Sequence, residues 1–314
     1  MKAEATKILH NDATGIGRAS ALLQNGQLVA FPTETVYGLG ADARDGSAVA
    51  AIYEAKGRPR FNPLIVHLPD LDAARRIGQL NDTAMTLAQA FWPGPLSLVV
   101  PLRPDHGLSG LVTAGLDTVA LRVPAHPLAK ALLRSFGGPL AAPSANPSGR
   151  ISPTKADHVL SGLQGRIAAV LDGGDCHVGL ESSIVDPATP PRLLRPGGLS
   201  KDAIEACIRA PLQGAQAGQV TSPGQLTSHY APNAKLRPNA VTKRPDEVHL
   251  GFADIPGDIS LSRAGDLREA AARLFGCLHE LDLDGRAIAV APVPDDGLGQ
   301  AINDRLKRAA AMRD

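Results

Sequence analysis

The sequence predicts an α/β protein with two domains. Short apolar runs of strand length alternate along the chain with segments whose apolar residues recur every three or four positions. The 314 residues, 44% of them hydrophobic, suffice for one large or two medium cores. A stretch rich in Gly, Gln, Ser, Thr and Pro over 210–233 reads as a linker. We therefore expect a first domain over 1–208, a linker over 209–234 and a second domain over 235–314.

Composition argues against several classes of protein. The 32 Lys and Arg residues nearly balance the 31 Asp and Glu residues, so no global field draws the chain onto nucleic acid or an anionic membrane. Aromatic residues make up only 3%, few for a protein that stacks single-stranded bases. The three cysteines lie far apart in no metal-ligand spacing, which suits a reducing compartment. No apolar run is long enough to span a bilayer, and we expect a cytoplasmic location.

The first elements are a helix over 14–26 and a buried strand over 28–31, which leads into FPTETVYGLGAD (31–42). Pro32 ends the strand, and four of the next five residues are polar or carry a hydroxyl. Gly38 and Gly40 would let the backbone turn tightly or approach a ligand. Such a loop could hold a small polar molecule, or it could be an ordinary connection whose hydroxyls cap the next helix.

The next helix is expected to begin at an N-cap Ser47 and to end at Lys56-Gly57. It leads into the sequence KGRPRFNPLIVH (56–67), which has three cations in its first five residues and no acid. Two prolines fix the path of this basic loop into a strand over 64–68. The loop suits a polyanion, although most charged turns are simply solvated.

Two short helices with N-caps Asp70 and Asp82 continue the alternation. In the strand over 118–124, side chains alternate so that Thr118 and Arg122 share one face. A lone arginine at a strand end is more often a surface ion-pairing residue than a ligand clamp. The other elements expected in the first domain are strands over 96–102, 139–142, 168–171 and 182–186 and helices over 126–136 and 200–208.

Another polar loop, PSANPSG (143–149), follows a short strand. Ser152-Pro153 is then typical of a helix start, whose backbone N–H groups could face an anion. The linker contains SPGQLTSHYAP (222–232), and a plain linker would not need its His-Tyr pair. The second domain is expected to contain strands over 247–252 and 287–293 and helices over 266–281 and 298–310.

The polar loops share one feature: each lies at a strand end, and together they supply hydroxyls, amides and cations with few carboxylates. Such a set binds phosphate and carboxylate oxygens. The sequence has no P-loop, no glycine-rich dinucleotide fingerprint, no GxSxG, no HExxH and no paired CxxC. Spacing alone therefore indicates an anion-binding, or more specifically a nucleotide-binding, α/β protein.

Eight motifs in order carry a resemblance to a known family: PTETVYGLGAD, KGRPRFNPLIVH, WPGPLSLV, VALRVP, APSANPSG, ESSIVD, LLRPG and SPGQLTSHYAP. They resemble the threonylcarbamoyl-AMP synthase family in its long form. The resemblance implies a YrdC-like first domain, with a twisted mixed sheet, helices and a central cleft, and a small Rossmann-like α/β second domain. It covers residues 14–235 densely and the remainder by architecture only. Gln225 departs from the Met that is common in the family after Ser-Pro-Gly.

The resemblance implies an ATP-dependent reaction. Threonine and bicarbonate form a carbamate, whose carboxylate attacks the α-phosphorus of ATP to give threonylcarbamoyl-AMP and pyrophosphate. ATP is thus a substrate, and Mg²⁺ is expected to accompany its triphosphate. Partner proteins would move the threonylcarbamoyl group onto an adenosine of tRNA, and a weak contact with tRNA and no contact with membranes are further expectations.

By the same resemblance, Lys56 and Arg58 act on the triphosphate and stabilise the leaving pyrophosphate. Arg122 would pair with the threonine carboxylate as a bidentate fork, and Tyr230 would fold back as a lid. Without the family, His67 is an ordinary half-buried strand histidine. The expected ATP contacts are Arg58, Asn62, Thr118, Ser144, Asn146, Ser152, Arg195 and Tyr230, and the expected threonine contacts are Thr35, His67, Arg122 and Ser182.

Two other functions fit parts of the pattern. An RNA-binding module of the same fold, without adenylate synthesis, would use the basic loop on phosphates and would bind less tightly as salt rises. A carbamoyl- or acyl-transferring enzyme would use the same cleft without ATP. Release of pyrophosphate separates both from the adenylate-forming reaction.

Overall fold

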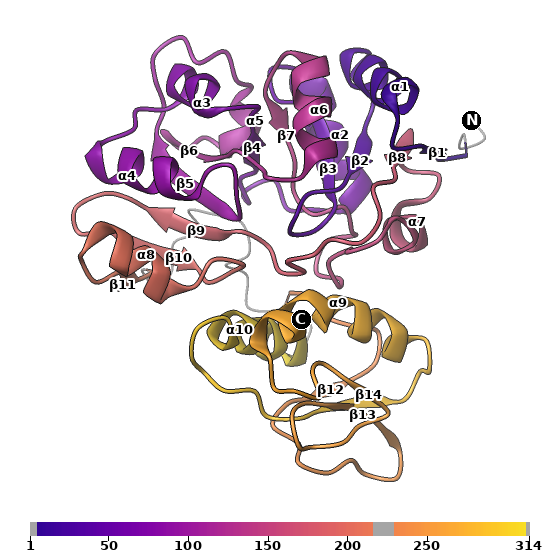
Figure 1. Ribbon diagram of the computed structural model, residues 1–314. Helices are drawn as coiled ribbons and strands as arrows, with labels where there is room; N and C mark the ends of the chain where they lie inside the picture. Colours follow the sequence, from indigo (N-terminus) through magenta and orange to yellow (C-terminus); the bar gives the residue numbers. More distant parts are fainter. Residues whose placement is uncertain (1–4, 216–228, 312–314) are drawn as a thin grey trace.

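The computed structural model describes residues 5–215 and 229–311, and Figure 1 shows two domains, the smaller one below the larger. The larger domain contains, in chain order, β1 (Lys7–Leu9), α1 (Ala13–Gln24), β2 (Val29–Phe31), β3 (Gly38–Asp42), α2 (Gly46–Lys56), β4 (Ile65–His67), α3 (Leu71–Ile77), α4 (Asp82–Phe91), β5 (Leu96–Pro101), α5 (Gly110–Thr113), β6 (Thr118–Arg122), α6 (Pro127–Phe136), β7 (Leu140–Ala141), α7 (Ala156–Leu163), β8 (Ala169–Leu171), β9 (Ser183–Asp186), β10 (Arg192–Arg195), α8 (Lys201–Ile208) and β11 (Gln213–Gly214). The smaller domain contains β12 (Leu236–Arg237), β13 (Glu247–Gly251), β14 (Ile259–Ser260), α9 (Leu267–Asp282), β15 (Ala287–Val290) and α10 (Gly299–Ala310). None of the helices in these described residues is long and apolar enough to cross a membrane.

The larger sheet is mixed, in the order β1-β8-β2-β3-β7-β4-β6-β5-β9-β10-β11, which confirms the expected α/β class with a mixed sheet. β4 and β6 run parallel, with His67 opposite Arg122, whereas β5 and β6 run antiparallel, with Val99 opposite Ala120. This register places the two polar residues side by side at the same end of neighbouring strands.

The smaller sheet has the order β12-β15-β13-β14, and all its pairings are parallel. Helices α9 and α10 lie between this sheet and the larger domain (Figure 1). The apolar core beneath them also takes in Val36, Ile151 and Leu180 of the larger domain. The two domains therefore share one buried apolar surface.

The stretch after β2 is not simply a loop. Residues Gly38–Asp42 form β3, which pairs antiparallel with β2, so Gly38 and Gly40 lie in a strand. A Cβ at Gly40 would lie 2.9 Å from Cε1 of Phe31, so the glycine makes room for that ring.

Three expected helix starts are wrong. Asp45, rather than Ser47, caps α2 by accepting from the Ser47 N–H, and Asn81, rather than Asp82, caps α4 by accepting from the Ala84 N–H. In both helices, the residue with an extended backbone just before the first turn lies one or two positions earlier than the expected cap. Ser152 starts no helix: α7 begins at Ala156, and the buried Ser152 side chain is bonded elsewhere.

Within the segment expected to be a linker, β11 pairs with β10 of the larger sheet. Residues 216–228 of that segment, with Gln225 and most of the SPGQLTSHYAP motif, lie outside the described residues. The domain boundaries therefore stay a prediction.

Candidate active site

A small cavity of about 40 Å³ lies where β4 and β6 end, between Arg58 of the basic loop and Tyr230. Its wall includes residues from the expected site that are far apart in sequence: Arg58, His67, Arg122, Ser144, Ser182, Arg195 and Tyr230. None of the described residues of the smaller domain lines this cavity. Two of them, Phe275 and Arg305, pack against the ring of Tyr230.

Unpaired polar atoms gather around this cavity. In the described chain, eight buried side-chain nitrogen or oxygen atoms have no hydrogen-bond partner. Seven of the eight belong to residues that line the cavity or contact its lining: Asn62, His67, Asn146, His229, Tyr230 and Arg305. Because buried polar groups are normally satisfied, this concentration indicates a place for a polar ligand.

Lys56 joins the basic loop to the second polar loop. Its Nζ donates to the carbonyl oxygen of Ser144 at 2.6 Å and to that of Asn146. The side chain is buried and lies behind the wall of the cavity rather than in it. Burial, with a smaller effect from the Arg58 charge, holds the pKa of Lys56 well below its usual value.

Arg58 lies in the wall, and carbonyl oxygens hold it in place. Its Nε donates to Asn62 O at 3.2 Å, and its Nη2 donates to Pro63 O at 2.9 Å. Burial lowers the pKa of Arg58 to about 10, so the guanidinium is still charged at neutral pH. The side-chain amide of Asn62 is buried beside it without a partner.

Arg122 forms a buried ion pair that the sequence alone did not indicate. Its Nη2 lies 2.6 Å from Oε1 of Glu34, whose other oxygen accepts from the Ala125 N–H at 3.0 Å. Burial acts to raise the pKa of Glu34, but the charge and hydrogen bond of Arg122 outweigh it, and the pKa lies below its usual value. Burial, followed by the Arg122 charge, lowers the pKa of the neighbouring His67 to about 3, so this histidine is neutral.

Ser182 and Arg195 form a second buried group. Arg195 Nη2 donates to the backbone oxygen of Ser182 at 2.8 Å and to its Oγ at 3.2 Å. The Ser182 hydroxyl also bonds the Ser97 hydroxyl at 2.8 Å. Thr35 lies one layer behind the cavity, where its hydroxyl bonds that of Thr33 at 2.7 Å.

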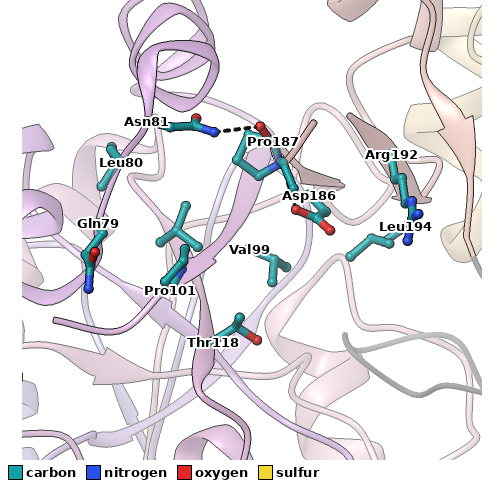
Figure 2. Close-up of a pocket in the computed structure, with 12 residues that line it drawn as sticks. Gln79, Leu80, Asn81, Val99, Pro101, Thr118, Asp186, Pro187, Arg192 and Leu194 are labelled. Atoms are coloured by element: carbon teal, nitrogen blue, oxygen red, sulfur yellow. Dashed lines mark hydrogen bonds between the residues drawn. The ribbon is translucent and has the colours of Figure 1, made fainter. Parts of the chain in front are cut away.

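Thr118 does not reach this cavity. It lines a separate pocket of about 580 Å³, together with residues of β5 and β10 such as Val99 and Leu194 (Figure 2). Thr118 and Arg122 are at opposite ends of β6, about 13 Å apart at the usual rise per residue. An apolar cluster of Ile65, Val99, Ala120, Ile184 and Leu194 covers the face of the sheet between the two ends.

Besides Glu34, two further residues at the site were missed from the sequence. Glu181 accepts from the Ser152 hydroxyl at 2.5 Å and from Nε of Arg305 in the smaller domain at 2.8 Å. The sequence does carry a signal for Arg305. In α10 it lies on the buried face of the helix, together with the apolar residues Ile302, Leu306 and Ala309. Glu181 has none beyond its place in the ESSIVD motif.

The described residues offer no ready-made metal site. Among them, no group of three or more His, Cys, Asp and Glu side chains could hold a metal ion. Both carboxylates closest to the cavity, Glu34 and Glu181, are already paired with arginines. The protein groups therefore do not fit Mg²⁺ as ligands, and an ion that arrives with ATP would be carried by phosphate oxygens.

Comparisons with known proteins cover both domains. A family model described as "Telomere recombination" matches residues 21–197, and one described as "Threonylcarbamoyl-AMP synthase, C-terminal domain" matches residues 199–311. The threonylcarbamoyl-AMP synthase of Bacillus subtilis is 43% identical over 99% of this chain and 97% of its own, and that of Pyrococcus abyssi is 38% identical over 94% of each. The crystal structure of P. abyssi Sua5 complexed with L-threonine superposes with a TM-score of 0.88 at 35% identity and covers 97% of both chains.

Proposed function

Because the chain belongs to the threonylcarbamoyl-AMP synthase family, we propose that it converts L-threonine, bicarbonate and ATP into threonylcarbamoyl-AMP and pyrophosphate. It is an enzyme of the nucleotidyltransferase type that serves tRNA modification. The observation in its own structure that carries the proposal is the set of buried cations and unpaired polar atoms around one cavity. Other proteins would then transfer the threonylcarbamoyl group to tRNA.

The reaction needs charge neutralisation more than a protein nucleophile. The carbamate of threonine attacks the α-phosphorus of ATP, and the bond to the pyrophosphate oxygen breaks. Arg58 and Arg195 supply positive charge for the triphosphate and the departing pyrophosphate. Lys56 acts on the same step by fixing the carbonyl groups of the loop with Ser144 and Asn146, which brings that loop against the basic loop.

Threonine would bind at the end of β6. Arg122 is the cation for its carboxylate, and Glu34 holds that guanidinium in one orientation. His67, which is neutral, and Ser182 line the same cavity as Arg122 and would contact the bound amino acid. Thr35 supports this end of the site through Thr33.

The nucleoside of ATP would extend along the same face of the sheet. The apolar cluster that separates Arg122 from Thr118 offers a surface for a planar base, and the pocket at Thr118 has a volume of about 580 Å³, which suits a nucleoside. Thr118, which lines that pocket (Figure 2), would thus contact ATP at the end opposite the triphosphate. Ser152, bonded to Glu181, would act behind the phosphates.

Tyr230 would serve as the cover of the site. A cavity of about 40 Å³ holds only a few water molecules, far less than the ligand pockets of about 300 Å³ or more that are typical of small-molecule sites. Threonine and a triphosphate therefore enter only when part of the wall moves. Tyr230 and its neighbour His229 are the wall residues that lie nearest in sequence to the stretch between the two domains, and we assign this movement to Tyr230.

The deciding experiment is pyrophosphate release from ATP by the purified protein with bicarbonate present. Release is expected with threonine and to be much weaker with serine or without an amino acid. Release that ignores threonine or bicarbonate would contradict the proposed reaction. Absence of release, together with salt-sensitive RNA binding, would instead favour an RNA-binding module of the same fold.

A further inference from the structure

Arg305 is the largest fully buried side chain in the described residues, with no exposed surface. It is carried by α10 of the smaller domain. Its Nε donates to Oε2 of Glu181 at 2.8 Å, its Nη1 donates to Asp304 at 2.8 Å, and its Nη2 is buried without a partner. An arginine buried to this extent is rare and costly unless it is paired.

The guanidinium contacts two residues of the cavity wall, Glu181 of the larger domain and Tyr230 of the stretch between the domains. Glu181, which lines the cavity, also accepts from Ser152 at 2.5 Å. The ring of Tyr230 lies between Arg305, whose Cζ is 4.9 Å from the ring centre, and Phe275, whose ring centre is 5.6 Å away. One side chain of the smaller domain thus sets the position of two wall residues.

Arg305 is not needed merely to hold the domains together. The shared apolar core includes Val36, Ile151 and Leu180 of the larger domain, and the His229 N–H donates to the backbone oxygen of Arg308 at 3.3 Å. These contacts fix α10 against the larger domain independently of the Arg305 side chain. Loss of the buried ion pair of Arg305 should therefore change the cavity wall without separating the two domains.

Charge gives the pair a second role. Glu181 lies within electrostatic reach of Arg195 as well as of Arg305. When Arg305 neutralises Glu181, that carboxylate does not cancel the positive charge that Arg195 contributes to the cavity. Without Arg305, an uncompensated buried carboxylate would remain beside the place where the triphosphate is expected, and it would repel phosphate.

We propose that Arg305 is a positioning residue for the active site, which acts through Glu181 and Tyr230 on the wall that faces the triphosphate. Catalysis in the larger domain would thereby depend on one side chain of the smaller domain. The inference rests on the proposed function, because it takes the triphosphate to bind at this wall.

The test compares Arg305→Met and Arg305→Lys with Lys307→Met in the full-length protein. Lys307 is an exposed residue of the same helix, so its substitution removes a charge without touching the wall. We expect Arg305→Met to raise the KM for ATP about tenfold and Arg305→Lys, which keeps the charge, to recover part of that loss. Lys307→Met should behave as the wild type.

Nitration of tyrosines by tetranitromethane, mapped by mass spectrometry, gives a measure that does not depend on activity. All three tyrosines, Tyr37, Tyr53 and Tyr230, are buried. In Arg305→Met we expect Tyr230 alone to become reactive. Reaction of all three would mean that the fold has opened, and the Arg305→Lys protein then decides the question.

Wild-type kinetics and a protected Tyr230 in folded Arg305→Met, or in Arg305→Lys if only that variant folds, would overturn the inference. A lower melting temperature with an unchanged KM for ATP would also overturn it, because that result assigns Arg305 to stability alone. If the wild type releases no pyrophosphate, the proposed function fails. The nitration pattern would still show whether Arg305 positions Tyr230.

Discussion

At the scale of single residues, backbone oxygens hold the cations of the basic loop in place. Lys56 donates to the carbonyl groups of Ser144 and Asn146, and Arg58 donates to those of Asn62 and Pro63. A carbonyl oxygen has only a partial negative charge. The loop therefore fixes the geometry of both side chains, and Arg58, with a pKa of about 10, keeps nearly all its positive charge for a bound polyanion.

Removal of the Arg58 side chain should abolish ATP-dependent turnover and leave the fold intact. The guanidinium lies in the cavity wall, and loss of one such cation should lower pyrophosphate release by about a hundredfold or more. Arg60→Ala is the matched control, because Arg60 is exposed in the same loop. Near-normal release by a folded Arg58→Ala protein would remove Arg58 from the triphosphate site.

Glu34→Gln should weaken threonine binding selectively. The substitution keeps the shape of the side chain but removes the charge that orients Arg122, so we expect the KM for threonine to rise by about tenfold with a smaller change in the KM for ATP. Steady-state kinetics with each substrate varied separately would measure both values. Glu54→Gln, an exposed change on α2, serves as the control, and equal increases in both KM values would contradict a role specific to threonine.

Motifs could predict residues of the larger domain that form the cavity wall, because the signal lies within a few neighbouring positions. The pair of Glu181 and Arg305 could not be found in that way, since 124 positions separate the two residues. The same holds for Glu34 and Arg122, 88 positions apart, whose pairing depends on how the strands are ordered in the sheet. Thr118 shows that closeness in sequence can also mislead. It is only four residues from Arg122, but because β6 is an extended strand it lines a different pocket.

At the scale of elements, the end of α2 sets the direction of the basic loop. Gly57 caps the helix in the left-handed region, with φ of 61°, and the Arg58 N–H then donates to Tyr53 O at 2.9 Å. Lys56 and Arg58 flank this glycine, one behind the cavity wall and one in it. The backbone conformation at Gly57 therefore decides where both cations point.

Gly57→Ala should lower both stability and activity. A Cβ at this position would meet no atom within 4 Å, so its cost is conformational, about 1 kcal/mol of unfolding free energy. Gly107→Ala is a matched control, because Gly107 has φ of 69° and equally open surroundings. Urea unfolding should show similar losses for the two variants. Pyrophosphate release should fall only in Gly57→Ala, and equal activities would mean that the cap does not aim the loop.

The sequence indicated the longer helices and the central strands because their apolar periodicity extends over several residues, as in α6 and α9. It did not indicate β3, where Pro32 and a polar stretch over 33–37 precede a glycine-rich strand that packs against Phe31. It also placed caps one or two residues late at Ser47 and Asp82. The residue that caps depends on the backbone angles before the first turn, and the side-chain types Asp, Asn and Ser alone do not fix them.

At the scale of the whole molecule, histidines mark the contact between the two domains. His158 of α7 and His279 of α9 stack with ring centres 3.9 Å apart. Burial, with the charge of the other ring as a further cause, lowers the pKa of His158 to about 3. His279 Nε2 also contacts the backbone oxygen of Ser152, so the stack connects α9 to the segment behind the cavity.

Acid should destabilise the folded protein before its carboxylates titrate. Burial is the main cause that lowers the pKa of both His67 and His229 to about 3, below the value of about 6.5 expected in the unfolded chain. The folded state thus binds fewer protons than the unfolded state below pH 6.5. The contribution of these neutral histidines to the unfolding free energy is fully present above pH 6.5 and is lost as the pH drops toward 3. The loss at pH 5 is about 2 kcal/mol for each histidine.

Glu34 and Glu181 have pKa values below the usual range for a glutamate, so they remain ionised at pH 5 and do not contribute to this loss. Urea unfolding at pH 7 and pH 5 would measure it. His67→Gln should reduce the difference between the two pH values by about 2 kcal/mol, whereas His10→Gln, at an exposed position, should leave it unchanged. If the loss of stability between pH 7 and pH 5 were the same in His67→Gln and the wild type, His67 would be protonated in the folded protein. Its proposed role as a neutral contact to bound threonine would then be wrong.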